Sequence, residues 1–405
     1  MSTLITNIAE LMTQDPDHRI LKGAAVVVDG ERIAWLGQAA DAPAADESVD
    51  AGGRALLPGW VDSHTHLIFA GDRTAEFEAR MAGESYSAGG IAVTTGATRA
   101  TGDFDLTRLA LGRVAEAVSQ GTTYLETKTG YGLDIDNEAR SARIASTVVD
   151  EVTYLGAHLV PAGMDAEEYT DLVCGPMLSA VRPFVRWADV FCERGAFTED
   201  QSRRVLQACR DAGLGLRVHG NQLGEGPGVR LAVEFGAASV DHVNYLSADD
   251  VDALAASWSG WDGCDSDTGT ARGTVATCLP ACDLSTRQPL APGRELLDAG
   301  VQLALASNCN PGTSYTSSMA FCVTTAVLQM GLSVHEAVRA ATYGGALALG
   351  RESGNDADGE RAVGSIAVGH RADLHLLNAP SATHLAYRPG MPLTHAVWRA
   401  GVRAR

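Results

Sequence analysis

Eight short segments rich in β-branched residues alternate with amphipathic, alanine-rich stretches over most of this chain. Helical patterns at residues 106–120, 199–213 and 247–257 lie between the apolar segments, with Ser, Thr or Asp at several positions suited to a helix N-cap. Eight alternations of strand and helix predict an α/β fold, a parallel (β/α)8 TIM barrel. The strand candidates are residues 55–67, 121–132, 150–161, 187–197, 213–223, 237–246, 273–282 and 301–312.

Both ends of the chain depart from this alternation. Residues 24–37 contain two strand patterns joined by Asp29-Gly30, a dipeptide suited to a tight hairpin turn, and residues 364–380 and 395–405 have the same strand-rich texture. We therefore expect the two ends to form one small β-sandwich-like domain. The predicted domain boundaries are 1–57 and 361–405 for the small β-domain and 58–360 for the barrel.

Composition and charge restrict the partners of such a chain. Its 405 residues carry a formal net charge of −19, a field that repels nucleic acid and anionic membranes. No stretch approaches the roughly twenty apolar residues of a membrane span, and no basic start precedes an apolar run, so we expect a cytoplasmic protein. Its eight cysteines lack a C-x-x-C pair and are expected to be reduced. An anionic substrate would need a local Arg or Lys.

One segment breaks the alternation of strands and helices. Residues 257–273 are rich in Gly, Asp and Ser and lie between a helix pattern and the seventh strand candidate. Such a composition predicts a surface loop. Its two tryptophans leave open an interface or an edge of the active site.

His64-Thr65-His66 is the first motif that carries chemistry. Side chains two residues apart on a strand share a face, so both imidazoles are able to converge on one metal ion. Asp62 precedes the motif and Pro58-Gly59 opens the segment. This context places the histidines at the C-terminal end of the first barrel strand, where barrel active sites are assembled.

Polar side chains also lie where later strand candidates end. A single histidine at such a position is more often a hydrogen-bonded core residue than a ligand, but five histidines at strand ends favour one shared site. Beyond His64 and His66, the strand-end residues are Lys128, Tyr131, His158, Glu193, His219, Gln222, His242, Asn308 and Asn310.

The motifs around these positions resemble the amidohydrolase superfamily and, within it, the imidazolonepropionase family of histidine degradation. Superfamily markers are PGWVDSHTHL, His219, Asp241-His242 and the G-x-x-A-D-L of residues 369–374; narrower markers are FAGDRTAEF (69–77), KTGYG (128–132), LGAH (155–158) and NPGTS (310–314). The narrow set is specific because other superfamily members do not share it. The resemblance covers nearly the whole chain. It implies a metal-dependent hydrolase that opens the cyclic amide of 4-imidazolone-5-propanoate to N-formimino-L-glutamate.

The resemblance also implies roles for individual residues. It implies one divalent or trivalent ion, zinc or iron, held by His64, His66, His219 and Asn308. The residues implied to bind imidazolone propanoate are Arg73, Tyr131, His158 and Gln222, and those implied to hold the opened product are Asn310, Gly312 and Thr313. The implied catalytic residues are His242, Asn308 and His158. A homodimer is expected from superfamily habit.

These residue types suit amide hydrolysis. A bound metal ion makes a water nucleophilic at neutral pH and acts as a Lewis acid toward the ring carbonyl. The guanidinium of Arg73 is able to pair with the propanoate through two hydrogen bonds, although an arginine in a loop is commonly an ordinary surface ion pair. His158 or His242 is expected to stabilise the tetrahedral oxyanion or to pass a proton.

Asn308 is the departure that matters, because the family carries Thr-Asp where this chain has Ser307-Asn308. The family's aspartate binds metal and accepts the proton of the hydrolytic water. Asparagine retains the shape and an amide oxygen but has no charge and is not a useful general base, so metal affinity and turnover are expected to fall. Three explanations stand: a substitution made to trap a substrate complex, a naturally impaired relative, or a different base such as His242. Gly220 after His219 is a smaller departure, since Ala is commoner there.

Two further functions compete with the leading hypothesis. The same barrel with a different pocket would make another cyclic amidohydrolase or a ring deaminase. A non-catalytic protein that binds the same ligands is the other alternative, and Asn308 is the feature that supports it. The enzyme is favoured because the surrounding pocket residues are intact.

Overall fold

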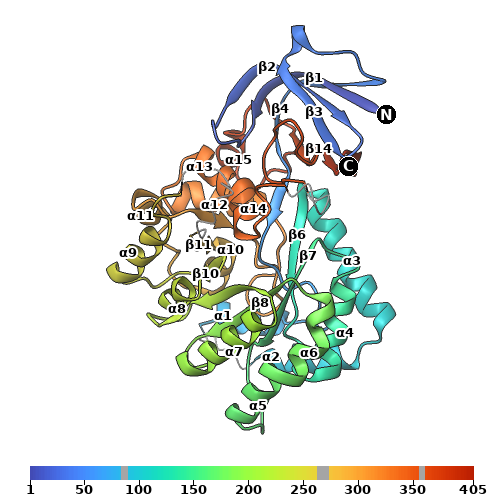
Figure 1. Cartoon of the computed structure of the whole chain (residues 1–405). Coiled ribbons are helices and arrows are strands. Elements are labelled where there is room, and N and C mark those ends of the chain that lie inside the picture. Colours follow the sequence, from blue (N-terminus) through green and yellow to red (C-terminus); the bar gives the residue numbers. More distant parts are fainter. Residues whose placement is uncertain (84–89, 262–272, 355–360) are drawn as a thin grey trace.

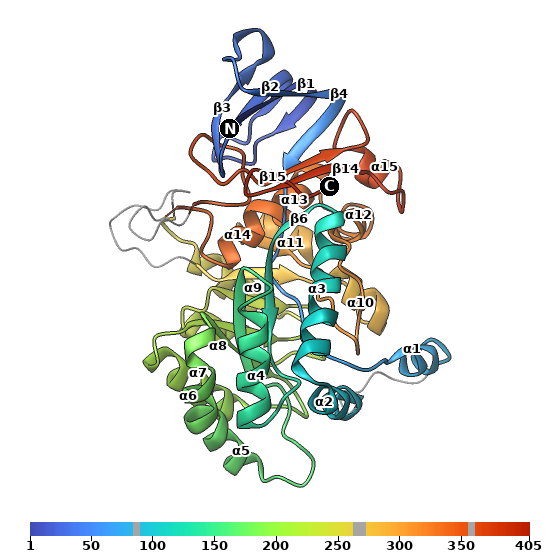
Figure 2. The same cartoon turned by 90° about the vertical axis from the view of Figure 1, so that its right-hand side faces the viewer.

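A computed structural model describes residues 1–83, 90–261, 273–354 and 361–405, and its strands form two separate sheets. An eight-stranded sheet has the order β12-β11-β10-β9-β8-β7-β6-β5, with parallel pairing between neighbours. A seven-stranded mixed sheet stands at one end of it (Figure 1). Helices surround the eight-stranded sheet in both views (Figure 2). The predicted barrel and the predicted small β-domain are confirmed.

Each of the eight strand candidates contains a strand of the barrel. These strands are β5 (Trp60–Asp62), β6 (Thr122–Lys128), β7 (Glu151–Ala157), β8 (Trp187–Cys192), β9 (Gly215–Gly220), β10 (Ser239–His242), β11 (Val275–Cys278) and β12 (Leu303–Leu305). The helices along the chain are α1 (Thr74–Met81), α2 (Ile91–Ala100), α3 (Asp103–Ser119), α4 (Ile135–Ala145), α5 (Ala166–Leu172), α6 (Leu178–Val181), α7 (Glu199–Asp211), α8 (Gly228–Glu234), α9 (Ala248–Ser257), α10 (Pro280–Thr286), α11 (Gly293–Asp298), α12 (Met319–Gln329), α13 (Val334–Arg339), α14 (Gly345–Ala348) and α15 (His384–Tyr387).

The small sheet joins the two ends of the chain. Its strands are β1 (Ser2–Met12), β2 (Ile20–Asp29), β3 (Arg32–Gln38), β4 (Glu47–Pro58), β13 (Leu374–Leu377), β14 (Thr394–Arg399) and β15 (Val402–Arg403). The predicted hairpin at Asp29-Gly30 joins β2 and β3, which pair antiparallel with Asp29 opposite Arg32. The C-terminal strand β13 pairs with β4, so the chain returns to the sheet in which it began. The domain boundaries at 57/58 and 360/361 stay a prediction.

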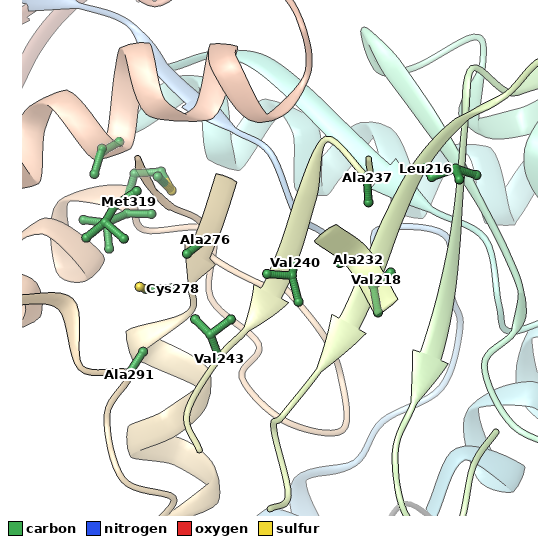
Figure 3. Packing of buried hydrophobic residues seen from close by; sticks show 14 of the residues in the cluster. Leu216, Val218, Ala232, Ala237, Val240, Val243, Ala276, Cys278, Ala291 and Met319 are labelled. Atoms are coloured by element: carbon green, nitrogen blue, oxygen red, sulfur yellow. The ribbon is translucent and has the colours of Figure 1, made fainter. Parts of the chain in front are cut away.

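Alternation along the barrel strands separates an apolar outer layer from a polar interior. Val218, Val240 and Ala276 are partners across β9, β10 and β11 and belong to one buried hydrophobic cluster (Figure 3). The next residues, His219 and Asp241, are also partners in register, and successive side chains of a strand point to opposite faces. The interior of this barrel therefore carries titratable groups where many barrels carry Val, Ile and Leu.

Polar contacts join the first barrel strand to the last. The Ser307 amide donates to Asp62 Oδ1 at 3.0 Å, and the Ser307 hydroxyl donates to Asp62 Oδ2 at 2.5 Å. The Asn308 amide donates to the His64 carbonyl at 3.0 Å. Burial raises the pKa of Asp62 to about 7 despite these hydrogen bonds. The contacts bring the segment after β5 against the segment after β12, where the predicted ligands from both strands lie.

The structure corrects the secondary structure around the His-x-His motif. A single strand over residues 55–67 was predicted, but β4 ends at Pro58 in the small sheet and β5 ends at Asp62 in the barrel. His64 and His66 lie beyond the strand, in a segment without regular secondary structure. Gly59 separates the two strands and packs so closely on Thr123 that an added Cβ would clash with it. Apolar residues lie on both sides of this junction, Leu56 and Leu57 before it and Trp60 and Val61 after it, which is why the pattern predicted one strand.

The insertion at 257–273 lies mostly outside the described residues, so its prediction as a surface loop stays open. At its start Trp258 is buried, stacks edge-on against Trp261 at 5.0 Å and donates its indole N–H to the Thr274 carbonyl. The cysteines within the described ranges are free thiols. No helix in those ranges combines the length and the apolarity needed to cross a membrane.

His375 lies at the junction of the two sheets and makes stability sensitive to acid. Its ring packs edge-on against that of Trp60, with 5.1 Å between the ring centroids. Burial is the main cause that lowers the pKa of His375 to about 3, and the positive charge of Arg405 is the second. Above pH 6.5 neither the folded nor the unfolded chain protonates this ring. As the pH falls from 6.5 toward 3 the unfolded chain binds a proton and the folded chain does not, so stability falls by about 1.4 kcal/mol per pH unit.

We predict that His375→Gln reduces this acid sensitivity. The free energy of unfolding, measured by urea denaturation, should drop between pH 7.5 and pH 5.0 by roughly 2 kcal/mol more in the parent than in the variant. His335→Gln, at an exposed position on α13, is the control and should keep the parent's pH dependence. An equal drop in the parent and in His375→Gln would contradict the burial of an uncharged imidazole.

Candidate active site

One cavity collects nearly all of the predicted site residues. Of the twelve, eleven line it, and the hydrophobic side chains of Ile91, Leu159 and Phe191 complete its wall. The remaining residue, His64, is fully buried next to the cavity, with its ring 5.3 Å from that of His66 and 4.5 Å from that of His219. The eleven are His66, Arg73, Tyr131, His158, His219, Gln222, His242, Asn308, Asn310, Gly312 and Thr313.

Two of the histidines are oriented by buried carboxylates. His64 Nδ1 lies 2.7 Å from Asp241 Oδ2, and His219 Nδ1 lies 3.0 Å from Asp189 Oδ2. Each Nδ1 must carry the proton in such a contact, which leaves Nε2 with a free lone pair. Carboxylate–histidine pairs of this kind fix the tautomer and the ring orientation of metal-binding histidines.

Lys128 supports both carboxylates at once. Its Nζ lies 3.0 Å from Asp189 Oδ2 and 3.8 Å from Asp241 Oδ2, the same oxygens that contact the histidines. It also lies 3.1 Å from Glu126 Oε1, and all of these side chains are fully buried. Burial alone would raise the pKa of Asp189, but His219 and Lys128 hold that pKa below its ordinary value.

Arg217 is the second cation of this network and lies 3.1 Å from Asp241 Oδ2. Burial opposes the ionisation of Asp241, yet Arg217 and His64 hold its pKa well below the ordinary range. Two cations and three carboxylates leave one net negative charge beneath the imidazoles. That excess favours a bound cation above them.

The donor atoms that face this region fit a metal ion. His64 Nε2, His66 Nδ1, His242 Nδ1 and Asn308 Oδ1 are buried atoms with no hydrogen-bond partner among the described residues. Ligand atoms of His64, His219 and His242 lie within 4.8 Å of one another. Burial lowers the pKa of His64, His66 and His242 well below the ordinary value, so these imidazoles are neutral and have lone pairs to offer. The structure therefore adds His242 as a neighbour of the predicted ligands.

Asn308 offers its amide oxygen to this cluster. Its backbone has φ 67°, a left-handed conformation that Asn adopts more readily than most residues. Its Nδ2 donates to Thr313 Oγ1 at 2.7 Å. Its Oδ1 is buried and has no hydrogen-bond partner among the described residues, so it is free to bind a metal ion.

His158 and Tyr131 form one wall of the cavity. His158 Nδ1 lies 2.8 Å from the Gly130 carbonyl, and its ring lies 5.5 Å from that of Tyr131 and 5.7 Å from that of His66. Burial lowers the pKa of His158 to about 4, so this imidazole is neutral near pH 7. The ring therefore carries its proton on Nδ1 and presents Nε2 as an acceptor.

The loop of residues 310–314 also lines the cavity and is held by hydrogen bonds within the loop. The Gly312 amide donates to Asn310 Oδ1 and the Asn310 amide donates to the Ser314 carbonyl, each at 2.8 Å. Arg80 of α1 donates to the Gly312 carbonyl at 2.9 Å. Arg80 was not predicted, although it lies only three residues beyond the FAGDRTAEF segment.

Several residues of the network beneath the site were missed or were left without a role by sequence reasoning. Lys128 was recognised as a strand-end residue but not as part of the site, and Glu126, Asp189 and Arg217 were not singled out. A charged residue inside an otherwise apolar strand, such as Asp189 in Trp187–Cys192, is the sequence signal that could have found them.

Comparisons with known proteins agree with this geometry. Residues 192–401 match the model of the amidohydrolase family. The chain is 88% identical over 405 residues to the imidazolonepropionase of Arthrobacter sp. strain FB24, with all of both chains covered. It is 67% identical over 408 residues to the imidazolonepropionase of Micrococcus luteus, covering 100% of this chain and 99% of that protein. This chain belongs to the imidazolonepropionase family of amidohydrolases. The predicted family and the prediction of a hydrolase are confirmed.

Solved structures of distant relatives share the fold. A triazine hydrolase variant superposes with a TM-score of 0.74 at 19% identity, covering 99% of this chain and 94% of that one. An adenosine deaminase from Xanthomonas campestris with bound zinc superposes with a TM-score of 0.70 at 18% identity, covering 99% and 92%. Family membership and the donor set together favour a divalent metal ion in this chain. The predicted homodimer and the predicted cytoplasmic location stay predictions.

We predict that Asp189→Asn weakens metal binding. The variant removes the charge that orients His219 and that pairs with Lys128, and loss of such a supporting carboxylate typically lowers metal affinity by about 10–100-fold. Competition with a chromophoric zinc chelator measures the dissociation constant without reference to activity. Asp171→Asn, an exposed position on α5, is the control and should bind zinc as the parent does. Unchanged affinity in Asp189→Asn would contradict the orienting role.

Proposed function

We propose that this chain hydrolyses the ring amide of 4-imidazolone-5-propanoate to give N-formimino-L-glutamate. The observation that carries the proposal is one cavity in which a cation, Arg73, faces the imidazole cluster together with Tyr131, His158 and Gln222. A heterocycle with an anionic tail matches that arrangement, because the tail needs the guanidinium and the ring needs neutral hydrogen-bonding partners. Relatives at 67–88% identity are imidazolonepropionases.

We assign one ion, zinc or iron, to the four predicted ligands. A divalent ion in such a site supplies Lewis acidity to a carbonyl oxygen and makes a water nucleophilic near neutral pH. Nε2 of His64 and Nε2 of His219 are the donors that the carboxylate contacts leave free. His66 and the amide oxygen of Asn308 complete the set, each with a buried atom that lacks a partner within the described ranges.

His158 is assigned to the substrate ring. With Nδ1–H donating to the Gly130 carbonyl, its Nε2 accepts a hydrogen bond and does not donate one. A neutral acceptor suits a ring N–H of imidazolone better than it suits a developing oxyanion. The sequence left both substrate binding and catalysis open for His158, and this assignment keeps substrate binding.

His242 is assigned to proton transfer. Its backbone has φ 85°, an uncommon conformation for a residue other than glycine, and such conformations persist where the surroundings enforce them, often at functional sites. The ring lies 5.3 Å from that of His219 and borders the cavity, with Nδ1 free of partners among the described residues. A neutral imidazole in this position is able to relay the proton of the attacking water to the leaving ring nitrogen, and a carboxylate at position 308 would take that proton from the water more directly.

The loop residues Asn310, Gly312 and Thr313 are assigned to the opened product. They line the same cavity as Arg73, so the carboxylate of the product keeps its cation while the new acyl end lies along the loop. Thr313 also accepts from Asn308, which links the product-binding loop to the predicted metal ligand.

Asn308 favours a second candidate function, a protein that binds these ligands without efficient turnover. An amide oxygen is a weaker ligand than a carboxylate and cannot accept the proton of the hydrolytic water. The rest of the cavity is complete, so binding of the ligand would survive a defect at this residue.

We predict that Asn308→Asp raises kcat for hydrolysis of 4-imidazolone-5-propanoate by about 100-fold or more, because general-base catalysis contributes about 10²–10⁴-fold. The carboxylate is accommodated without rearrangement, since the hydroxyl of Thr313 is able to reverse its role and donate to it. Loss of imidazolone absorbance in zinc-loaded and iron-loaded protein measures the rate.

Asn310→Asp is the matched control, because it introduces the same charge in the same loop at a residue outside the predicted metal ligands. It should not raise kcat. If the metal-loaded Asn308→Asp protein shows no hydrolysis, the proposed substrate is wrong. If that protein binds imidazolone propanoate by calorimetry but never forms product, the binding function is supported instead.

A further inference from the structure

Arg73 forms an ion pair with Glu76, which accepts two hydrogen bonds from one edge of the guanidinium. Arg73 Nε donates to Glu76 Oε2 and Nη2 donates to Glu76 Oε1, both at 2.6 Å. The arginine side chain is 5% exposed and the glutamate side chain 32% exposed. This is the paired geometry by which guanidinium and carboxylate bind most strongly and most directionally.

The Nη1 side of the guanidinium, which Glu76 leaves unoccupied, lies beside Gly312, another residue that lines the cavity. Arg73 lines that cavity whereas Glu76 does not, so the carboxylate holds the edge away from the ligand space. Nη1 donates to Thr94 Oγ1 of α2 at 3.2 Å. Glu76 of α1 and Thr94 of α2 together hold the planar group from two elements.

Two glycines from separate segments make room for this pair. A Cβ on Gly312 would lie 2.7 Å from Arg73 Nη1, and a Cβ on Gly90 would lie 2.1 Å from Glu76 Oε2 and 2.3 Å from Arg73 Nη2. All three distances are far below van der Waals contact. The chain thus keeps side chains away from the guanidinium on the cavity side and from the ion pair at the start of α2.

Glu76 also cancels the charge of Arg73. In a chain of net charge −19, a neutral pair does not attract an anion over long distances. Recognition of a carboxylate must then come from directional hydrogen bonds at short range, and these depend on how the guanidinium is oriented.

We propose that Glu76 is a positioning residue that fixes Arg73 for end-on binding of the substrate's carboxylate and thereby determines selectivity for acids over uncharged analogues. This inference rests on the proposed function. It assigns to Glu76 a role in substrate selection rather than in the chemical step.

The test compares two ligands that differ only in the charge of the tail. Calorimetry on the zinc-loaded protein measures Kd for imidazole-4-propanoate and for its methyl ester. The parent should bind the acid at least about tenfold more tightly, and Glu76→Gln should reduce that preference by about five- to tenfold, while Kd for the ester stays within about twofold. With imidazolone propanoate, Glu76→Gln should raise KM and change kcat little.

Glu78→Gln is the matched control, since it removes the same charge from an exposed position two residues along α1. It should keep the acid preference of the parent. Gly90→Ala, which leaves both charged residues in place but crowds the pair, should lower the acid preference as Glu76→Gln does, and thermal melting of each variant checks that it is folded.

Three results would overturn the inference: an acid preference unchanged in Glu76→Gln, tighter binding of the acid in that variant, or an equal loss for acid and ester. Tighter binding would show that Glu76 competes with the ligand for Arg73. Failure of the proposed function has a different signature, because it is judged by the absence of imidazolone hydrolysis in the Asn308→Asp protein.

Discussion

The site depends on the buried ammonium of Lys128. This one cation lies between the two carboxylate oxygens that orient His64 and His219, in a barrel interior from which water is excluded. Removing one partner of a buried ion pair commonly costs about 3–5 kcal/mol, because it leaves an uncompensated charge. The network therefore fixes five barrel strands relative to one another. His64 follows β5, Lys128 ends β6, and Asp189, His219 and Asp241 lie on β8, β9 and β10.

Strand register and local backbone then bring the ligands together. His219 and Asp241 are partners across β9 and β10, so the network beneath the site follows directly from sheet pairing. The contacts between Asp62 and Ser307 bring the segments after the first and last strands together, and Asn308, with a left-handed backbone, lines the same cavity as His66, His219 and His242. The part of the cavity proposed to bind the substrate's carboxylate is built differently, since Arg73, Glu76 and Gly312 lie in loops and in the first turn of α1. The proposed metal site is thus held by barrel strands, whereas the residues proposed to select the substrate lie mainly in loops.

Much of this could be predicted from the sequence, and the reasons are specific. Alternating strand and helix patterns predicted all eight barrel strands, and family motifs predicted twelve candidate site residues, eleven of which line one cavity. Two kinds of feature were not predicted from the sequence: contacts between distant strands and one strand boundary. Lys128, Asp189 and Arg217 interact only through the folded barrel, because strands distant in sequence bring them together, and no local pattern encodes that contact. The break at Gly59 was not predicted because apolar residues lie on both sides of it, whereas the structure assigns its two sides to different sheets.

The central claim is that buried carboxylates turn Nε2 of His64 and Nε2 of His219 toward a single metal ion. Anomalous diffraction at the zinc absorption edge, from crystals of the zinc-loaded chain, tests it most directly. The account predicts one strong peak at zinc–nitrogen bonding distance, about 2.0–2.1 Å, from both of these atoms. A peak bonded to the carboxylates of Asp189 or Asp241, or bonded to either histidine through Nδ1, would contradict it.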